Sequence, residues 1–109
     1  MSKRKDDEMA DVFRALGHPV RVQIVRMLND DGAAYAGDIV SRLPVVASTA
    51  SQHLKILREA GLISDAADGP HRYYSVEKKA IRDLQAWVKR ILFRASASMR
   101  STASALSGN

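Results

Sequence analysis

Four polar side chains at the start of one expected helix have the chemistry needed to contact DNA bases. They open the stretch STASQHLKILREAGL, residues 48–62, and are Ser48, Thr49, Ser51 and Gln52. Base edges in the major groove present hydrogen-bond donors, acceptors and the thymine methyl group, which suit hydroxyl, amide and small apolar side chains. Serine and threonine at a helix start more often act as caps. The stretch taken alone therefore leaves base contact and helix capping as alternatives.

Cationic side chains near this helix suit the DNA backbone. Lys55 and Arg58 follow one and two turns further along, where they can reach phosphates, which fix register without reading sequence. His71 and Arg72 come directly after the turn signal ADGP, which separates two short strand-like runs. We therefore expect a β-hairpin beside the helix, with a basic residue placed to contact the adjacent backbone.

Hydrophobic spacing predicts the elements that hold these side chains in place. Apolar residues at three- and four-residue intervals mark amphipathic helices, and glycine or proline marks their ends. Gly17 ends the first helix, Pro19 opens the second, and Gly61 caps the helix that carries the polar side chains. The expected helices cover residues 6–16, 19–28, 37–43, 48–60 and 77–95, with a very short strand at Tyr35 and a hairpin of residues 62–66 and 71–76.

These elements predict a mainly α-helical fold with a small β-hairpin wing. Two short helices joined by a tight turn at Pro44 make a helix-turn-helix, and the following hairpin makes it a winged one. The buried side of the second of these helices is expected to carry Leu54, Ile56, Leu57 and Ala60. Its opposite side is then left for DNA.

The composition favours one small domain with a polyanionic partner. The chain has 109 residues, a formal net charge of +5 and a pI near 9.9. It has no cysteine, which excludes disulfides, thiol redox chemistry and thiolate metal sites. No apolar run approaches a membrane span, so we expect a cytoplasmic protein without membrane contact. We expect a flexible basic arm over residues 1–5, one domain over 6–96 and a disordered Ser/Ala-rich tail over 97–109.

Three segments resemble, in order and spacing, the signature segments of the ArsR/SmtB family of bacterial winged helix-turn-helix repressors. They are FRALGHPVRVQIVRML, STASQHLKILREAGLI and DGPHRYYSV, and the resemblance spans residues 9–92. It implies a homodimer that binds a palindromic promoter site and is released by a signal. The family's DNA-contacting positions fall on Ser48, Thr49, Ser51 and Gln52, with His53 near the DNA backbone and Arg72 in the wing.

Two departures from the family pattern concern the DNA-binding surface. Val46 stands where many members begin this helix with a serine or aspartate cap, and a missing cap costs about 1 kcal/mol. Asp65 and Asp68 make the wing more acidic than is usual in the family. Their negative charge disfavours a phosphate contact by the wing.

The resemblance also bears on sensing. The cysteines of sensors for soft metals or arsenite correspond to Tyr35 and Gly37 here, and no histidine follows His71 to form a zinc site on the last helix. His18, His53 and His71 have no partner at ligand spacing, so we expect no metal and no cofactor. A small-molecule effector of unknown identity is an open alternative. His71 could instead tune DNA affinity by gaining charge between about pH 5 and pH 8.

The two terminal helices offer more apolar surface than a small core can cover, which is typical of an interface. The residues expected at this dimer interface are Met9, Val12 and Phe13 on the first helix, and Trp87 and Ile91 on the last, with Phe93 nearby. The alternative is that both helices pack only onto their own domain.

The sequence is best interpreted as a sequence-specific DNA-binding transcriptional regulator that acts as a homodimeric repressor on an inverted-repeat operator. A winged-helix module that binds protein instead of DNA is the alternative, and the acidic wing favours it. An enzyme is not expected, because no nucleophile has a base at motif spacing and no phosphate-binding glycine loop or metal set is present.

Overall fold

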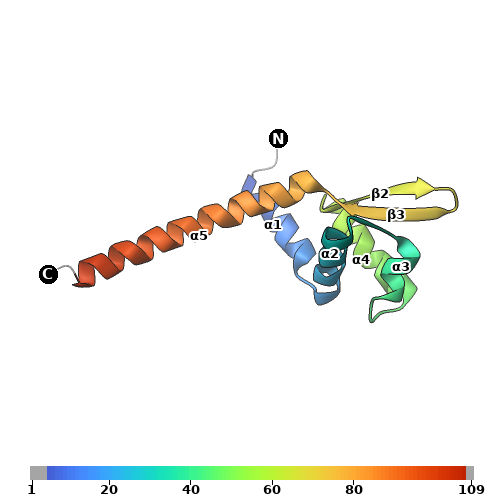
Figure 1. Ribbon diagram of the computed structural model, residues 1–109, viewed down its shortest axis with the longest axis horizontal. Coiled ribbons are helices and arrows are strands. Elements are labelled where there is room, and N and C mark those ends of the chain that lie inside the picture. The colour runs from blue at the N-terminus through green and yellow to red at the C-terminus, as the bar shows by residue number, and fades with distance from the viewer. Residues whose placement is uncertain (1–4, 108–109) are drawn as a thin grey trace.

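A computed structural model describes residues 5–107, with side chains for residues 5–97. Residues 1–4 of the predicted arm and residues 108–109 of the predicted tail lie outside the described part. The described residues form five helices and a small sheet, and Figure 1 shows how they are arranged. Their bounds are α1 Lys5–Leu16, α2 Pro19–Asp31, β1 Ala33–Tyr35, α3 Ala36–Ser41, α4 Ala47–Glu59, β2 Ile63–Asp68, β3 His71–Val76 and α5 Lys78–Ser107.

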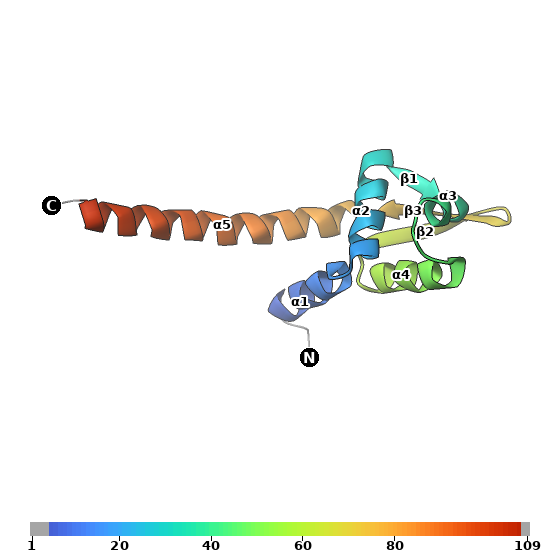
Figure 2. The same cartoon turned by 90° about the horizontal axis from the view of Figure 1, so that it is seen from below.

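The core forms around α2, as its apolar residues on more than one side predict. Ile24 and Leu28 of this helix are fully buried, together with Leu57 of α4. Pro19 occupies the first turn of α2, and the side chain of His18 caps the helix by accepting a hydrogen bond from the Val20 amide. The position of α2 between α1, α4 and the sheet fixes the direction of α4 (Figure 2).

The wing is an antiparallel sheet of three strands in the order β1-β3-β2. The predicted hairpin is confirmed: Asp68 pairs with His71, and Gly69 between them has a φ of 60°, which is unfavourable for other residues. The predicted short strand is confirmed as well, because Tyr35 of β1 pairs with Tyr73 of β3. The mainly helical winged fold is therefore as expected, and β1 joins the two strands of the hairpin in one sheet.

Helix α5 has 30 residues and extends far beyond the rest of the molecule (Figures 1 and 2). It continues past residue 95, where the predicted helix ends, because no glycine or proline occurs before Gly108 and alanine favours helix. Lys5 already belongs to α1, one residue before the predicted start. No helix within residues 5–107 combines the length and hydropathy that a bilayer crossing requires.

Candidate nucleic-acid interface

The polar side chains predicted to contact bases lie on the outer face of α4. Ser48, Ser51 and Gln52 are exposed, and the helical period places all three on one side with Lys55. Thr49 is half-buried at the edge of this group. We call Ser48, Ser51, Gln52 and Lys55 the outer face of α4. The fold thus presents short hydrogen-bonding side chains together with a cation on one helix side.

The opposite side of α4 anchors the helix in the core. Ala50, Leu54 and Leu57 are buried there, at three- and four-residue spacing. The prediction that Ile56 belongs to this side is wrong, since its side chain is 39% exposed. Leu54 marks the side of α4 that faces the core. Ile56 comes two positions later, which is about 200° around a helix with 3.6 residues per turn, so its side chain points away from that side.

The N-terminus of α4 has no side-chain cap, as the valine at this position predicts. Val46 is the N-cap residue, and no side chain accepts a hydrogen bond from the first turn. The positive end of the helix dipole therefore lies next to Ser48 without a neutralising carboxylate, since the first turn holds no acidic residue. Such a helix end favours a nearby anion.

His53 lies on the buried side of α4 and not on its outer face, which argues against its predicted position near the DNA backbone. It is only 9% exposed, and its ring centroid is 4.4 Å from that of His18. The Nδ1 atom of His53 lies 3.3 Å from the guanidinium of Arg21, whose Nε donates to the Ala15 carbonyl at 2.6 Å. No sequence spacing signals this cluster, because His18 and His53 lie far apart in the chain.

The cluster lowers the pKa of His53 from its ordinary value of 6.5. Burial is the largest cause, because it penalises the charged form, and the nearby His18 and Arg21 add to it. The unfolded chain consequently binds a proton more readily than the folded chain does. The contribution of neutral His53 to the free energy of unfolding is complete above the pKa that this histidine has in the unfolded chain. It is lost as the pH falls from that value toward the lower pKa of His53 in the folded chain.

We expect the melting temperature of the protein to fall between about pH 8 and about pH 5, and His53→Gln to reduce this fall. Glutamine keeps a hydrogen-bond acceptor for Arg21 but takes up no proton. Thermal melts followed by circular dichroism at several pH values measure the effect. His71→Gln, which changes an exposed histidine of the wing, is the matched control. Equal pH dependence of wild type and His53→Gln would show that His53 does not couple folding to protons.

The strand register separates two wing residues that are neighbours in sequence. Arg72 lies on the same face of β3 as buried Tyr74, which is the face toward α4. His71 lies on the other face, where its ring is 6.0 Å from that of Tyr35. The prediction that His71 joins Arg72 at the DNA-binding side is therefore not supported by the side-chain directions, because successive strand residues alternate.

Within the wing, Tyr35 of β1 is joined to β2 through Asp68. Its hydroxyl donates a hydrogen bond of 2.7 Å to the Asp68 carboxylate. The same hydrogen bond, with the charge of Asp68, raises the pKa of Tyr35, so the hydroxyl stays protonated. Within residues 5–107, no cluster of three or more histidine, cysteine or acidic side chains is arranged to hold a metal ion.

A carboxylate connects α4 to the wing. Asp65 of β2 accepts hydrogen bonds from Arg72 of β3 and, at 3.2 Å, from Arg58 of α4. The bond from Arg72 is the main reason why the pKa of Asp65 lies below its ordinary value, and Arg58 lowers it further. The two predicted phosphate-contacting arginines thus meet at one site. Lys55 is placed apart from them, with Glu59 at 3.9 Å.

Comparison with known proteins identifies this arrangement. A family model described as a bacterial regulatory protein of the arsR family matches residues 18–65. The transcriptional repressor SdpR of Bacillus subtilis is 35% identical over 80 residues, which cover 73% of this chain and 88% of that protein. The chain belongs to the ArsR family. The regulator YgaV of Escherichia coli is 31% identical over 85 residues, covering 78% of this chain and 86% of that protein.

A solved structure confirms the fold of this ArsR-family protein. An ArsR-like transcriptional regulator from Rhodococcus superposes with a TM-score of 0.74 at 23% identity, covering 92% of each chain. Together the family match and the relatives show that the chain is a DNA-binding transcriptional regulator. The prediction that the chain is not an enzyme is confirmed by the family and by these two relatives, which are transcriptional regulators.

Proposed function

We propose that this ArsR-family protein is a homodimeric repressor that binds an inverted-repeat operator. The observation that carries the proposal is the outer face of α4, where base-contacting side chains and Lys55 are exposed together. Ser48, Ser51 and Gln52 would contact base edges in the major groove. The repressor role is supported by the similarity to SdpR, which is named as a transcriptional repressor. Binding of the purified protein to duplexes selected from a random library tests it.

The exposed cations around α4 support the proposal of phosphate contacts. Lys55 lies on the outer face, whereas Arg58 and Arg72 flank it on the wing side. Thr49, half-buried at the edge of the face, is placed for a sugar or phosphate contact more than for a base. The uncapped start of α4 adds favourable potential for a phosphate.

Lys55→Gln should weaken binding to all duplex sequences alike and reduce the salt slope of the affinity by about one unit. The reason is that a phosphate contact releases counterions but carries no base information. Fluorescence anisotropy at several salt concentrations, on selected and random duplexes, measures both effects. Lys79→Gln is the matched control, because Lys79 is also exposed and paired with a carboxylate four residues later, Asp83 at 3.1 Å. A salt slope of Lys55→Gln equal to that of the control would remove Lys55 from the interface.

The dimer is proposed to form along α5. Its residues Ile81, Leu84, Val88, Ile91 and Leu92 make one apolar stripe, which we call the α5 stripe. Exposure rises along it, from half-buried Ile81 to 51% at Ile91 and 61% at Leu92, as the helix leaves its own domain. A helix projecting alone into water is marginally stable, so a partner along the stripe stabilises it.

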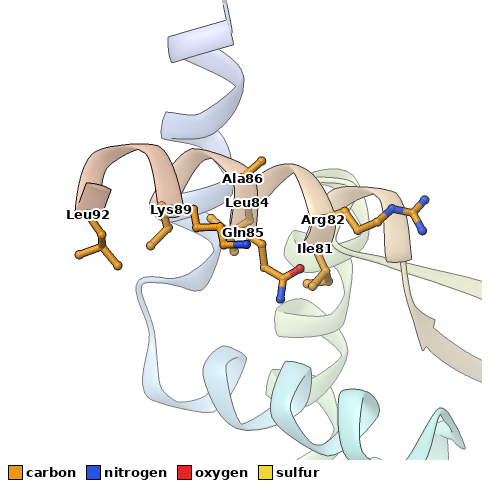
Figure 3. A pocket seen from close by; sticks show the side chains of 8 residues that line it. Ile81, Arg82, Leu84, Gln85, Ala86, Lys89 and Leu92 are labelled. Carbon is orange, nitrogen blue, oxygen red and sulfur yellow. The ribbon is translucent and has the colours of Figure 1, made fainter. Parts of the chain in front are cut away.

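The open surface along this stripe gives the second copy a place to pack. The residues that line it all belong to α5, and Figure 3 shows Ile81, Gln85 and Leu92 pointing to the same side of the helix. A mainly apolar surface on one helix suits a second helix better than a compact ligand, which needs an enclosing pocket. We therefore assign it to the partner subunit, and a small-molecule effector stays a separate prediction.

Among the predicted interface residues, the structure separates two groups. Met9 is 3% exposed and lies in the core of its own domain, so it cannot offer apolar surface to a partner. Phe13 is 40% exposed and packs edge to face against Trp87, with ring centroids 5.2 Å apart. Val12 is half-buried against the core. Phe13, Trp87 and Ile91 therefore carry the proposed interface on the side of α1.

A two-fold dimer of this kind would present two copies of α4 to one side of the duplex. Their spacing would match one helical turn, about 34–36 Å, and would require an inverted repeat. The alternative, a protein-binding winged helix, was favoured by the acidic wing. Asp65 and Asp68 are each bound within the fold, by arginines and by Tyr35 respectively, which weakens that alternative. Binding of random duplex that falls with salt separates the two functions.

A further inference from the structure

We propose that Asp65 is a positioning residue for DNA binding, which orients Arg58 and Arg72 together and limits their attraction to DNA of any sequence. The inference rests on the proposed phosphate contacts of these two arginines. Asp65 belongs to β2, whereas the arginines come from α4 and β3. The three side chains are therefore the charged link between the base-contacting helix and the wing.

The burial of the three side chains differs in a way that suits this role. The side chain of Asp65 is 15% exposed, whereas those of Arg58 and Arg72 are 42% and 52% exposed. A phosphate can therefore approach the guanidiniums more easily than it meets the carboxylate. Asp65 contacts one terminal nitrogen of each guanidinium. Because a guanidinium has five N–H donors in a fixed plane, each arginine keeps donors for a phosphate while Asp65 fixes its direction.

The charge of Asp65 has a second consequence. Two cations and one anion leave the cluster with a net charge of one, so its attraction to DNA is that of a single cation. Sequence-independent affinity depends on the number of phosphates that a protein neutralises. Removing the carboxylate therefore frees one further cation and at the same time removes the restraint on direction. Affinity for random DNA should rise, and discrimination should fall.

The test compares wild type with Asp65→Asn on two probes, a random-sequence duplex and the duplex that wild type selects from a random library. Each phosphate contact steepens the salt dependence of the affinity by about 0.9 log units per tenfold change in salt concentration. Lowering the salt from 1 M to 0.1 M therefore strengthens one added contact by a factor of roughly eight. We expect Asp65→Asn to bind random duplex about eightfold more tightly at that salt concentration, with a salt slope steeper by about one unit. Affinity for the selected duplex should rise less, so the ratio of the two affinities falls.

Asp68→Asn is the matched control, because it removes the same charge from the same strand. Asp68 binds the Tyr35 hydroxyl and, among the side chains of residues 5–97, no arginine, so the random-duplex affinity of this variant should change little. Equal gains for both variants would mean that only net charge matters, and the inference would be wrong. Equal fractional changes on both probes would equally overturn it, because a positioning residue must alter discrimination.

A third variant separates positioning from a general structural role. Combining Asp65→Asn with Arg58→Gln and Arg72→Gln should abolish the gain on random duplex, since no freed cation remains. A gain that persists without the arginines would contradict the inference. Wild type that selects no sequence and binds random duplex without salt dependence would refute the proposed function itself. A different result would refute only the role of Asp65. In that result, the wild-type protein binds DNA selectively, and Asp65→Asn has the same affinities as wild type.

Discussion

Ile91→Glu is expected to convert the dimer into monomers and to lower affinity for the selected duplex by at least about a hundredfold. Ile91 lies on the α5 stripe and is 51% exposed in the single chain, so the substitution leaves the core of the domain intact. Across a dimer interface, however, it would bury a carboxylate without a partner. Each monomer would then hold one half-site, and the gain from linking two half-sites would be lost.

Sedimentation velocity and fluorescence anisotropy on the same preparations measure the two effects. Phe93→Glu is the matched control, because Phe93 is 70% exposed and lies on the far side of α5 from Ile91. It introduces the same charge only two residues away. The control should remain dimeric and bind the selected duplex nearly as wild type does. Trp87→Glu is less informative, because Trp87 also packs against Phe13 of its own domain.

A monomeric Ile91→Glu that keeps wild-type affinity would contradict the dimer proposal, since a single α4 would then be sufficient for binding. Dimers formed by both variants would instead place the interface away from the α5 stripe. Either result leaves the assignment of the outer face of α4 untouched. The two proposals can therefore fail independently.

Gln52→Ala is expected to reduce discrimination between bases by about 1–3 kcal/mol at one base pair of each half-site. Base preference at the other positions should be unchanged. Gln52 is exposed on the outer face of α4, between Ser48 and Lys55 along the helix side. Its amide offers a donor and an acceptor together, which suits a bidentate contact with adenine. Selection from a random library with wild type and variant, followed by affinities for single-base variants of the selected site, measures the change.

Lys55→Gln is the comparison for this experiment, because its loss should be the same for every sequence. Both residues lie on one helix side, so a general disturbance of α4 would affect the two variants alike. If Gln52→Ala loses the same affinity on selected and on random duplex, its side chain does not read a base. In that case base contact would have to come from the hydroxyl groups of Ser48 and Ser51.

Local patterns made the helices and the hairpin predictable. The spacing of apolar residues, Pro19 and Gly61 placed the core helices with their ends, and ADGP placed the turn of the wing. Helix α5 was predicted too short, because the Ser/Ala-rich segment has no apolar stripe as regular as the one before it. Ile56 was wrongly predicted to be buried, because it is apolar like its neighbours Leu54 and Leu57. The residue type alone does not show which side of the helix the core covers.

The sequence by itself determined the elements of this protein, its basic charge and the polar outer face of α4, because helices and tight turns depend on residues a few positions apart. Only the tertiary structure decided which side chains meet. Helix packing brought His53 against His18 and Arg21, strand register turned His71 away from Arg72, and the approach of the wing to α4 joined Asp65 to both arginines. These contacts join residues from different elements, and their geometry is set by packing angles and register that no local spacing encodes.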